Sequence, residues 1–355
     1  MPEPEPVSGD RPAGAAGRYS AIERVAALGS ADYAQLADRR VVIVGCGALG
    51  SAVAGQLVRC GVGAVRVIDR DVVELRNLAH QSLYTEDDAA TGRPKAEAAA
   101  ARLRAVNAGC RVEGVVADLV PNNAKQLCAD ADLIVDGADN LETKLLLNDL
   151  AVATDTALIY GGCAGTEGSV LAIRPGRTHC LRCLWPAPTE AAARLTCETR
   201  GVLPGAVATV AALQSTEALK ILLDLDIGTL SGLVRIDIWD GVLRRVPTPA
   251  FRSEGRSCPA CGQRDLSYLR GQHATDAREL CGDDTVLLAS PTADLDLDRL
   301  RQRHRDNATL RALPDCVQVE VDGCRILAFA SGRTLIHGAG GLNRAKALYA
   351  RHVLG

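Results

Sequence analysis

Residues 41–51, VVIVGCGALGS, decide the fold of this 355-residue chain. Four apolar residues predict a buried strand, the three glycines that follow predict a tight turn, and residues 51–60 predict a helix. A GxGxxG turn between a strand and a helix brings backbone N–H groups close to a phosphate, where the helix dipole favours negative charge. Asp69 ends the next predicted strand, at a position that accepts ribose hydroxyls. The stretch therefore indicates a bound nucleotide.

The glycine motif by itself leaves the kind of nucleotide open. It is equally typical of an NAD- or FAD-dependent dehydrogenase, and a glycine turn can also serve only the packing of a helix on a sheet. Lys95, which opens a predicted helix, and Asp139-Asn140, which follow a predicted strand, favour ATP. A triphosphate needs a cation on its oxygens and a carboxylate for Mg²⁺, whereas hydride transfer does not. Taken singly, Lys95 also fits a solvated helix start and Asp139 a helix N-cap.

Predicted strands and helices alternate through residues 18–270, which predicts a Rossmann-like, doubly wound, mostly parallel sheet covered on both faces. The glycine motif belongs to this adenine-nucleotide-binding domain. The further predicted strands are residues 65–69, 111–117, 133–136, 157–160, 168–174 and 233–239. The further predicted helices are residues 19–36, 95–106, 122–128 and 206–223.

Both ends of the chain differ from this pattern. Residues 1–17 are rich in Pro, Gly and acidic side chains without an apolar run, which predicts a disordered tail and no signal peptide. Residues 271–355 predict a small α+β module. Its predicted elements are strands at 285–288 and 334–336, helices at 295–305 and 342–353, and a hairpin of 317–321 and 325–330 across Asp322-Gly323.

Composition excludes several classes of protein. The 40 basic and 43 acidic residues give a net charge of −3 without a long basic run, which argues against nucleic-acid binding and a basic membrane-surface helix. No apolar run approaches the ~20 residues that span a bilayer. Thirteen cysteines are too few for a disulfide scaffold in a chain of this length, so we expect a reducing, cytoplasmic compartment.

Two CxxC pairs predict a zinc site. Cys180, Cys183, Cys258 and Cys261 offer four thiolates, enough for a closed tetrahedral shell. The long gap between the pairs excludes a compact finger, so the Zn²⁺ would staple distant segments in a structural role. The alternative is two redox-active or incidental pairs.

Together these motifs resemble the ThiF/MoeB family, the adenylyltransferases that activate ubiquitin-like sulfur-carrier proteins. The similarity spans roughly residues 18–262. It includes Arg18-Tyr19-Ser20, the glycine motif, residues 71–78 (DVVELRNL), Gly92-Arg93-Pro94-Lys95, residues 136–140, both CxxC pairs and Thr196-Cys197. The module after about residue 280 resembles a C-terminal extension of some members.

The resemblance implies a homodimer that adenylates the carboxylate of a carrier ending in Gly-Gly, leading to a thiocarboxylate with a sulfur-donor protein as further partner. Lys95 and Asp139 are then catalytic, with Asp139 near Mg²⁺. The loop at 195–201 carries Cys197, where the family has a cysteine used in sulfur or acyl transfer; Arg200 could favour its thiolate, although a loop cysteine can be a spectator. The implied nucleotide contacts are nine residues: Gly45, Gly47, Ala48, Asp69, Asn77, His80, Lys95, Asp139 and Asn140.

The sequence departs from the family where arginines normally face phosphates. Ala21 and His80 replace two of them, and Lys144 replaces the arginine that follows Asp-Asn. Imidazole and ammonium do not reproduce a bidentate guanidinium. Arg24, about one helical turn after Ala21, is a candidate substitute. The departures keep two alternatives open: adenylation of a small-molecule or peptide carboxylate, and a non-catalytic member that binds a carrier.

Overall fold

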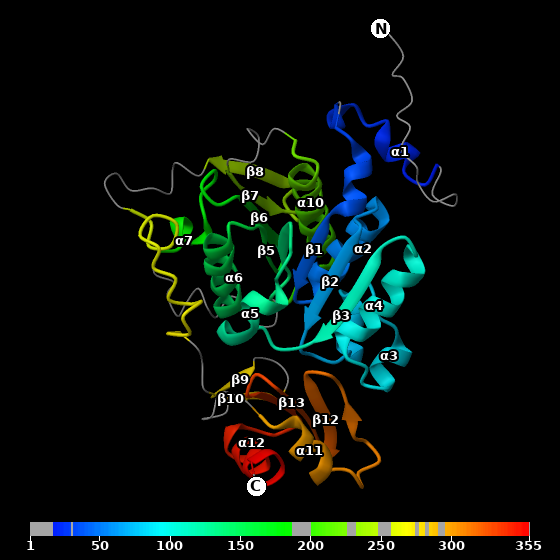
Figure 1. Cartoon of the computed structure of the whole chain (residues 1–355), viewed down its shortest axis with the longest axis vertical. Coiled ribbons are helices and arrows are strands. Elements are labelled where there is room, and N and C mark those ends of the chain that lie inside the picture. The colour runs from blue at the N-terminus through cyan, green and yellow to red at the C-terminus, as the bar shows by residue number, and fades with distance from the viewer. Residues whose placement is uncertain are drawn as a thin grey trace.

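A computed structural model describes residues 17–29, 31–186, 200–225, 232–247, 257–273, 277–280, 284–289 and 295–354 of the chain. The larger part is an eight-stranded sheet with helices on both faces (Figure 1). Its strand order is β3-β2-β1-β4-β5-β6-β7-β8. The predicted doubly wound, mostly parallel sheet is confirmed.

The sheet is parallel from β3 to β5 and antiparallel from β5 to β8. The parallel strands are β1 (Arg40–Val44), β2 (Ala64–Asp69), β3 (Arg111–Val116), β4 (Leu133–Asp136) and β5 (Ala157–Ala164). The antiparallel strands are β6 (Glu167–Ile173), β7 (Gly232–Asp237) and β8 (Val242–Pro247). The strand order reverses between β1 and β4, and open α/β sheets bind ligands beyond the carboxyl ends of the strands at such a point.

The apolar residues of β1 alternate between two cores because successive side chains point to opposite faces of a sheet. Val41 and Ile43 pack in the core on one face, and Val42 and Val44 in the core on the other. The first face carries α2 (Ala48–Cys60), α4 (Lys95–Val106) and α10 (Pro204–Leu222). The second carries α5 (Pro121–Leu127) and α6 (Leu141–Thr154).

Two predictions at the level of elements were wrong. Residues 19–36 do not form one helix: α1 (Ser20–Glu23) and the 3-10 turns Ala26–Leu28 and Tyr33–Asp38 are separate. Gly29 adopts a positive φ of 58°, which ends the first turns, and the Asp32 side chain accepts a hydrogen bond from the Ala34 N–H to start the next. The prediction also omitted α6, whose residues from Leu145 to Val152 are all buried and so show no helical periodicity.

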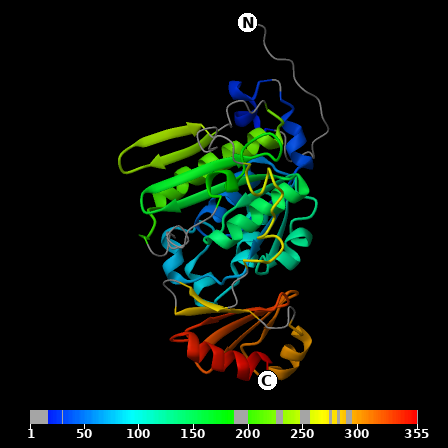
Figure 2. The ribbon, with the colours of Figure 1, turned by 90° about the vertical axis from the view of Figure 1, so that its left-hand side faces the viewer.

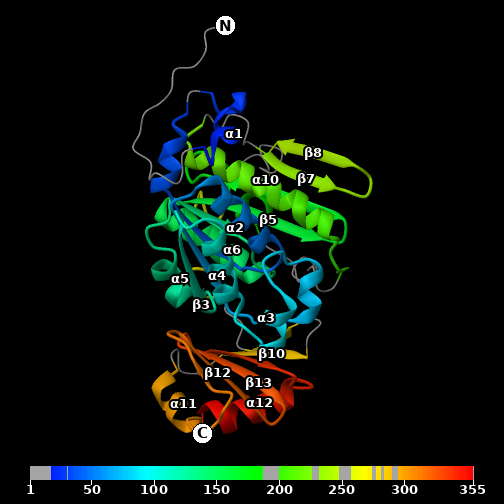
Figure 3. The same ribbon diagram turned by 90° about the vertical axis from the view of Figure 1, so that its right-hand side faces the viewer.

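The C-terminal module is a six-stranded antiparallel sheet of order β11-β12-β13-β14-β10-β9. The predicted hairpin is confirmed: Asp322 and Gly323, with φ of 50° and 74°, join two of its strands. Its helices cover the sheet face that points away from the larger part (Figures 2 and 3). The strands are β9 (Ala277–Leu280), β10 (Thr285–Ala289), β11 (Arg311–Ala312), β12 (Cys316–Val321), β13 (Cys324–Phe329) and β14 (Arg333–His337), and the helices α11 (Leu297–Arg303) and α12 (Leu342–Tyr349).

The other face of the module's sheet shares a hydrophobic core with the larger part. Val72, Ala96 and Val116 pack there against module residues that include Leu327 and Phe329. Two folded parts that share a core stabilise each other, so the module is held against the carboxyl ends of the parallel strands. The exact domain limits stay a prediction.

No helix among the described residues has the length and apolar character that a bilayer crossing requires. Of the tail predicted at 1–17, residues 1–16 lie outside the described ranges.

Candidate functional site

A cavity of about 700 Å³ lies at the carboxyl ends of the parallel strands, across the point where the strand order reverses. All nine residues proposed for nucleotide binding line it. They come from five separate stretches of chain: Gly45, Gly47 and Ala48; Asp69; Asn77 and His80; Lys95; and Asp139 and Asn140. The roles of the individual residues stay predictions, but the fold brings the whole set to one place.

The three glycines of the turn have different roles. Gly45 has a φ of 84°, and a Cβ there would lie 2.6 Å from the Gly137 carbonyl oxygen. A Cβ on Gly50 would lie 1.8 Å from the Gly45 carbonyl oxygen. Gly47, at the N-cap of α2, differs because a Cβ would meet only the Gln81 amide at 3.7 Å. The fold needs Gly45 and Gly50, whereas Gly47 leaves room beside the first N–H groups of α2.

Gly47→Ala is expected to leave the fold intact and to weaken the binding of MgATP by about 10-fold or more, because the added methyl takes the space of a phosphate at the helix start. Isothermal titration calorimetry measures the dissociation constant, and a thermal melt checks the fold. Gly50→Ala is the control: its Cβ overlaps a carbonyl oxygen, so we expect it to lower the melting temperature instead. Unchanged ATP affinity in a folded Gly47→Ala protein would contradict a phosphate position at this turn.

Asp69 is fixed at the end of β2 by two backbone donors. The Cys46 N–H donates to its Oδ2 at 2.6 Å and the Asp71 N–H to its Oδ1 at 2.7 Å. Burial raises the pKa of Asp69 to about 6, against the opposing effect of Lys95. The carboxylate is therefore held rigidly at the position where this kind of sheet binds a ribose.

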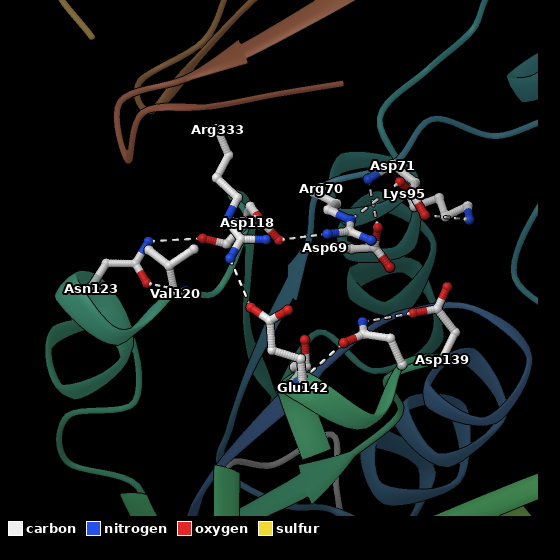
Figure 4. A network of polar contacts seen from close by, with 12 residues as sticks. Asp69, Arg70, Asp71, Lys95, Asp118, Val120, Asn123, Asp139, Glu142 and Arg333 are labelled. Carbon is white, nitrogen blue, oxygen red and sulfur yellow. Dashed lines mark hydrogen bonds and ion pairs between the residues drawn. The ribbon is translucent and has the colours of Figure 1, made fainter. Parts of the chain in front are cut away.

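Lys95 is the first residue of α4 and is almost fully buried. Its Nζ lies 3.4 Å from a carboxylate oxygen of Asp71. Burial alone lowers the pKa of Lys95, but Asp71, Asp69 and Asp139 outweigh it, and the pKa is raised. The cavity thus holds a permanent cation beside three carboxylates (Figure 4).

Asp139 is exposed, which leaves its carboxylate accessible in the cavity. The interpretation of Asp139 as a helix N-cap was wrong: Asn140 is the N-cap of α6, and its Oδ1 accepts from the Thr143 N–H at 2.9 Å. The Asn140 amide also donates to Asp139 Oδ1 at 3.0 Å. One asparagine therefore caps the helix and orients the neighbouring carboxylate, an oxygen ligand of the kind that Mg²⁺ prefers.

Asn77 and His80 reach the cavity from the 3-10 helix Leu75–Ala79 and its C-cap. Burial lowers the pKa of His80, and the nearby charges of Lys95 and Arg76 lower it further. A pKa below the ordinary value of about 6.5 leaves the imidazole mostly neutral at pH 7. His80 therefore does not restore the positive charge of the family's arginine.

Lys144 lies at the floor of the cavity. Its Nζ is 2.9 Å from an oxygen of the buried Asp136 and donates to the Gly161 carbonyl at 2.7 Å. The ammonium also lies over the Tyr160 ring, 5.1 Å from its centroid. Its charge is thus balanced by Asp136, and the ammonium links the end of β4 to Gly161 of β5.

Several lining residues were missed by the sequence reasoning. Arg70 and Asp118 follow the ends of β2 and β3, a position that could have marked them, because the carboxyl ends of parallel strands meet at one edge. The module residues gave no local signal. The missed residues include Arg70, Asp118, Tyr160, Cys163, Thr285 and His337.

The four cysteines predicted to hold zinc come together on the α6 face of the sheet. Their sulfur atoms all lie within 4.8 Å of one another. The Sγ–Sγ distances are 3.9 Å for Cys180–Cys183 and 3.6 Å for Cys180–Cys258 and Cys183–Cys261. Tetrahedral Zn²⁺ with bonds of ~2.3 Å sets its sulfurs about 3.8 Å apart, so the four thiols fit the ion.

Helix α6 holds both CxxC segments. The Leu181 N–H donates to Asn148 Oδ1 at 2.7 Å, and the Tyr268 N–H donates to Asp149 Oδ2 at 3.0 Å. The guanidinium of Arg182 lies 5.5 Å from the centroid of the Tyr268 ring. The middle of α6 is therefore tied to the first CxxC pair and to the chain that follows the second, while its N-cap, Asn140, lies at the cavity.

Cys197 lies outside the described residues, so its proposed role in sulfur or acyl transfer stays untested. The described residues on either side, Trp185 and Gly201, both line the cavity. Arg200, proposed to favour the thiolate, is half-exposed and pairs with Glu167 at 3.3 Å. Arg24 is exposed and is not among the residues lining the cavity of its own chain, so its role as a substitute for Ala21 stays a hypothesis.

Comparison with known proteins supplies an independent finding. The ThiF family model matches residues 19–260. The sulfur carrier protein ThiS adenylyltransferase of Bacillus subtilis is 40% identical over 335 residues, which cover 94% of this chain and 98% of the relative. The SAMP-activating enzyme E1 of Haloferax volcanii is 37% identical over 258 residues, covering 71% and 93%. A crystal structure of Escherichia coli MccB with ATP has a TM-score of 0.58 at 23% identity, covering 69% of this chain and 74% of that one, a likeness of fold alone.

Proposed function

Because this chain belongs to the ThiF family and is an adenylyltransferase, we propose that it uses ATP to activate the C-terminal carboxylate of a ubiquitin-like sulfur-carrier protein. The observation that carries the proposal is the convergence of the glycine turn, Asp69, Lys95 and Asp139 on one cavity. The names of two relatives that match most of the chain support the choice of a sulfur carrier as substrate. A carrier tail ending in Gly-Gly is narrow enough to bring its carboxylate into such a cavity.

Each residue has a part in the proposed reaction. The N–H groups at the start of α2 bind a phosphate, Asp69 accepts the ribose hydroxyls, and Lys95 offsets negative charge on the phosphate oxygens. Asp139 and Asp71 offer carboxylate oxygens at which Mg²⁺, when bound, would supply further charge neutralisation. A carboxylate oxygen of the carrier attacks the α-phosphorus, and the bond from that phosphorus to the bridging oxygen of pyrophosphate breaks. The products are a carrier acyl-adenylate and pyrophosphate.

The later steps and the assembly are part of the proposal. A donor protein's persulfide transfers its outer sulfur to Cys197 and keeps its own thiol, which makes Cys197 a persulfide. The outer sulfur of that persulfide attacks the acyl carbon and AMP leaves, which gives an acyl disulfide. A second thiol then attacks the Cys197 sulfur, forms a disulfide with it and releases the carrier thiocarboxylate. The resemblance supports a homodimer. The cysteines among the described residues are all free thiols, which supports a reducing compartment such as the cytoplasm.

ATP–pyrophosphate exchange tests the proposal. The zinc-loaded protein is expected to exchange labelled pyrophosphate into ATP only when a carrier protein ending in Gly-Gly is present, because exchange requires reversible formation of the acyl-adenylate. The matched control is the same carrier without its last glycine, which we expect to lower the rate by at least 10²-fold. Exchange with small peptides or acids but not with carriers would assign the site to another carboxylate. Nucleotide binding without exchange would contradict the enzyme function.

A further inference from the structure

The C-terminal module forms one side of the nucleotide cavity. Thr285 on β10 and His337 on β14 both line it and are directly paired in the module's sheet. Thr285 Oγ1 lies 2.9 Å from His337 Nδ1, which is 3.6 Å from a carboxylate oxygen of Glu74 on the larger part. The apolar core that the two parts share lies beside this contact. The module therefore rests on the rim of the cavity.

Arg333 crosses from the module to Asp118, which lines the cavity, and to Glu142, which lies between the lining residues Leu141 and Thr143 in the chain (Figure 4). Its Nη2 lies 2.8 Å from Glu142 Oε1 and its Nε 3.4 Å from Asp118 Oδ2. Glu142 is in the first turn of α6, after β4, and Asp118 follows β3 at the far side of the parallel strands. The side chain of Arg333 is 8% exposed and that of Asp118 5%. One buried guanidinium thus joins the segment after β3 to the first turn of α6.

Arg333 also balances charge at the cavity. Asp118 Oδ2 accepts no hydrogen bond from the described residues, and it forms an ion pair with Arg333. Asp118 Oδ1 accepts from Arg70 at 2.9 Å. Without Arg333, Asp118 would keep Arg70 as an ion partner, but its Oδ2 would lose the ion pair at a buried site that lines the cavity. An uncompensated carboxylate oxygen there would repel a polyanionic ligand.

The module also contacts the helix that starts with Lys95. Arg311 of β11 pairs with Glu97 at 3.2 Å, and Ala96 is buried in the shared core. Lys95 lies directly before these two residues. The position of the cavity's buried cation is therefore supported from the module side as well as by its own helix.

We propose that the C-terminal module is a permanent wall of the nucleotide site and that Arg333 is a positioning residue that neutralises Asp118 and Glu142, so that a nucleoside triphosphate can occupy the cavity. The inference rests on the proposed function only in taking ATP as the ligand of this cavity. It assigns to the module a part in binding rather than in catalysis. It therefore predicts an effect that grows with the charge of the ligand.

The test measures the dissociation constants of MgATP, ADP, AMP and adenosine for the full-length protein by calorimetry. Arg333→Met keeps most of the side-chain volume and removes the charge. We expect the affinity for ATP to fall about 10- to 100-fold, the affinity for AMP to fall less, and the affinity for adenosine to fall by less than about 3-fold. The reason is that charge repulsion scales with phosphate charge. Arg333→Lys is expected to recover most of the affinity. Arg351→Met is the matched control, since Arg351 pairs with Asp322 on the exposed outer side of the module.

A second variant keeps the inference testable where Arg333→Met does not fold. Glu142→Gln removes one carboxylate and leaves Arg333 in place. It is expected to raise the affinity for ATP by about 2- to 5-fold and to leave the affinity for adenosine unchanged. The inference would be overturned if Arg333→Met lost the same fold of affinity for all four ligands, or if Glu142→Gln bound ATP more weakly. Wild-type protein that binds ATP without carrier-dependent exchange contradicts only the proposed function. Wild-type protein that binds no nucleotide overturns both.

Discussion

Lys95→Met is expected to slow carrier-dependent ATP–pyrophosphate exchange by about 10²- to 10³-fold, the usual cost of removing one preorganised group that stabilises developing charge. Lys95 is buried at the cavity, and its pKa is raised by Asp71, Asp69 and Asp139, against the effect of burial. It therefore stays protonated throughout the physiological range. Methionine fills a similar volume, so the loss reports on the charge and not on a vacated space.

The variant also changes the carboxylates around position 95. Burial alone would raise the pKa of Asp71, but the charges of Lys95 and Arg70 outweigh burial and lower that pKa. A carboxyl whose pKa is depressed in the folded state adds stability above its unfolded pKa of about 4 and loses it as the pH falls. Lys95→Met removes much of that contribution. We therefore expect its melting temperature to be lower than that of the wild type at pH 7 and the two to approach each other toward pH 3.

Kinetics separate a catalytic lysine from a structural one. Initial exchange rates at several ATP concentrations, on protein shown to be folded by circular dichroism, give kcat and KM. The matched control is Lys125→Met, because Lys125 is exposed on α5 and is not among the lining residues. An exchange rate within about 3-fold of the wild type in Lys95→Met would remove Lys95 from the proposed mechanism.

Cys258→Ser is expected to have the largest effect on stability. It takes one thiolate from the shell whose four sulfurs are spaced for tetrahedral zinc. Structural zinc contributes about 10–16 kcal/mol to the folding of zinc-finger peptides. Here two hydrophobic cores also stabilise the sheet, so we expect the free energy of unfolding to fall by a smaller amount, about 3–5 kcal/mol, with a fall in melting temperature of about 10 °C.

Metal content and melting are measured on the same samples. Inductively coupled plasma mass spectrometry is expected to find about one zinc per wild-type chain and much less in Cys258→Ser. Cys60→Ser is the control, because Cys60 is a free thiol at the end of α2, away from the CxxC pairs. Hydrogen exchange of residues 257–273 is expected to rise in Cys258→Ser alone. Equal zinc content and equal melting in both variants would show that the four cysteines are not a structural metal site.

The local motifs of the nucleotide site were predictable because each rests on adjacent residues. The glycine turn requires a positive φ at Gly45 and close backbone contact at Gly50. Both requirements arise within a span of six residues. The start of the helix at Lys95 is local in the same sense, whereas the N-cap at Asn140 was missed. The hairpin at Asp322-Gly323 was also found this way. What failed was local too: a glycine and an aspartate divide the predicted helix over residues 19–36.

The sequence by itself determined the glycine turn between a strand and a helix and the two CxxC pairs, and it predicted a cation and carboxylates around a triphosphate. Only the tertiary structure decided that the C-terminal module closes one side of that cavity, that Arg333 joins Asp118 to Glu142, and that α6 links the cysteine cluster to the site. The reason is physical. Local motifs follow from backbone sterics and hydrogen bonds between near neighbours, whereas contacts between distant segments follow from which apolar faces pack together. Sequence spacing does not encode that choice.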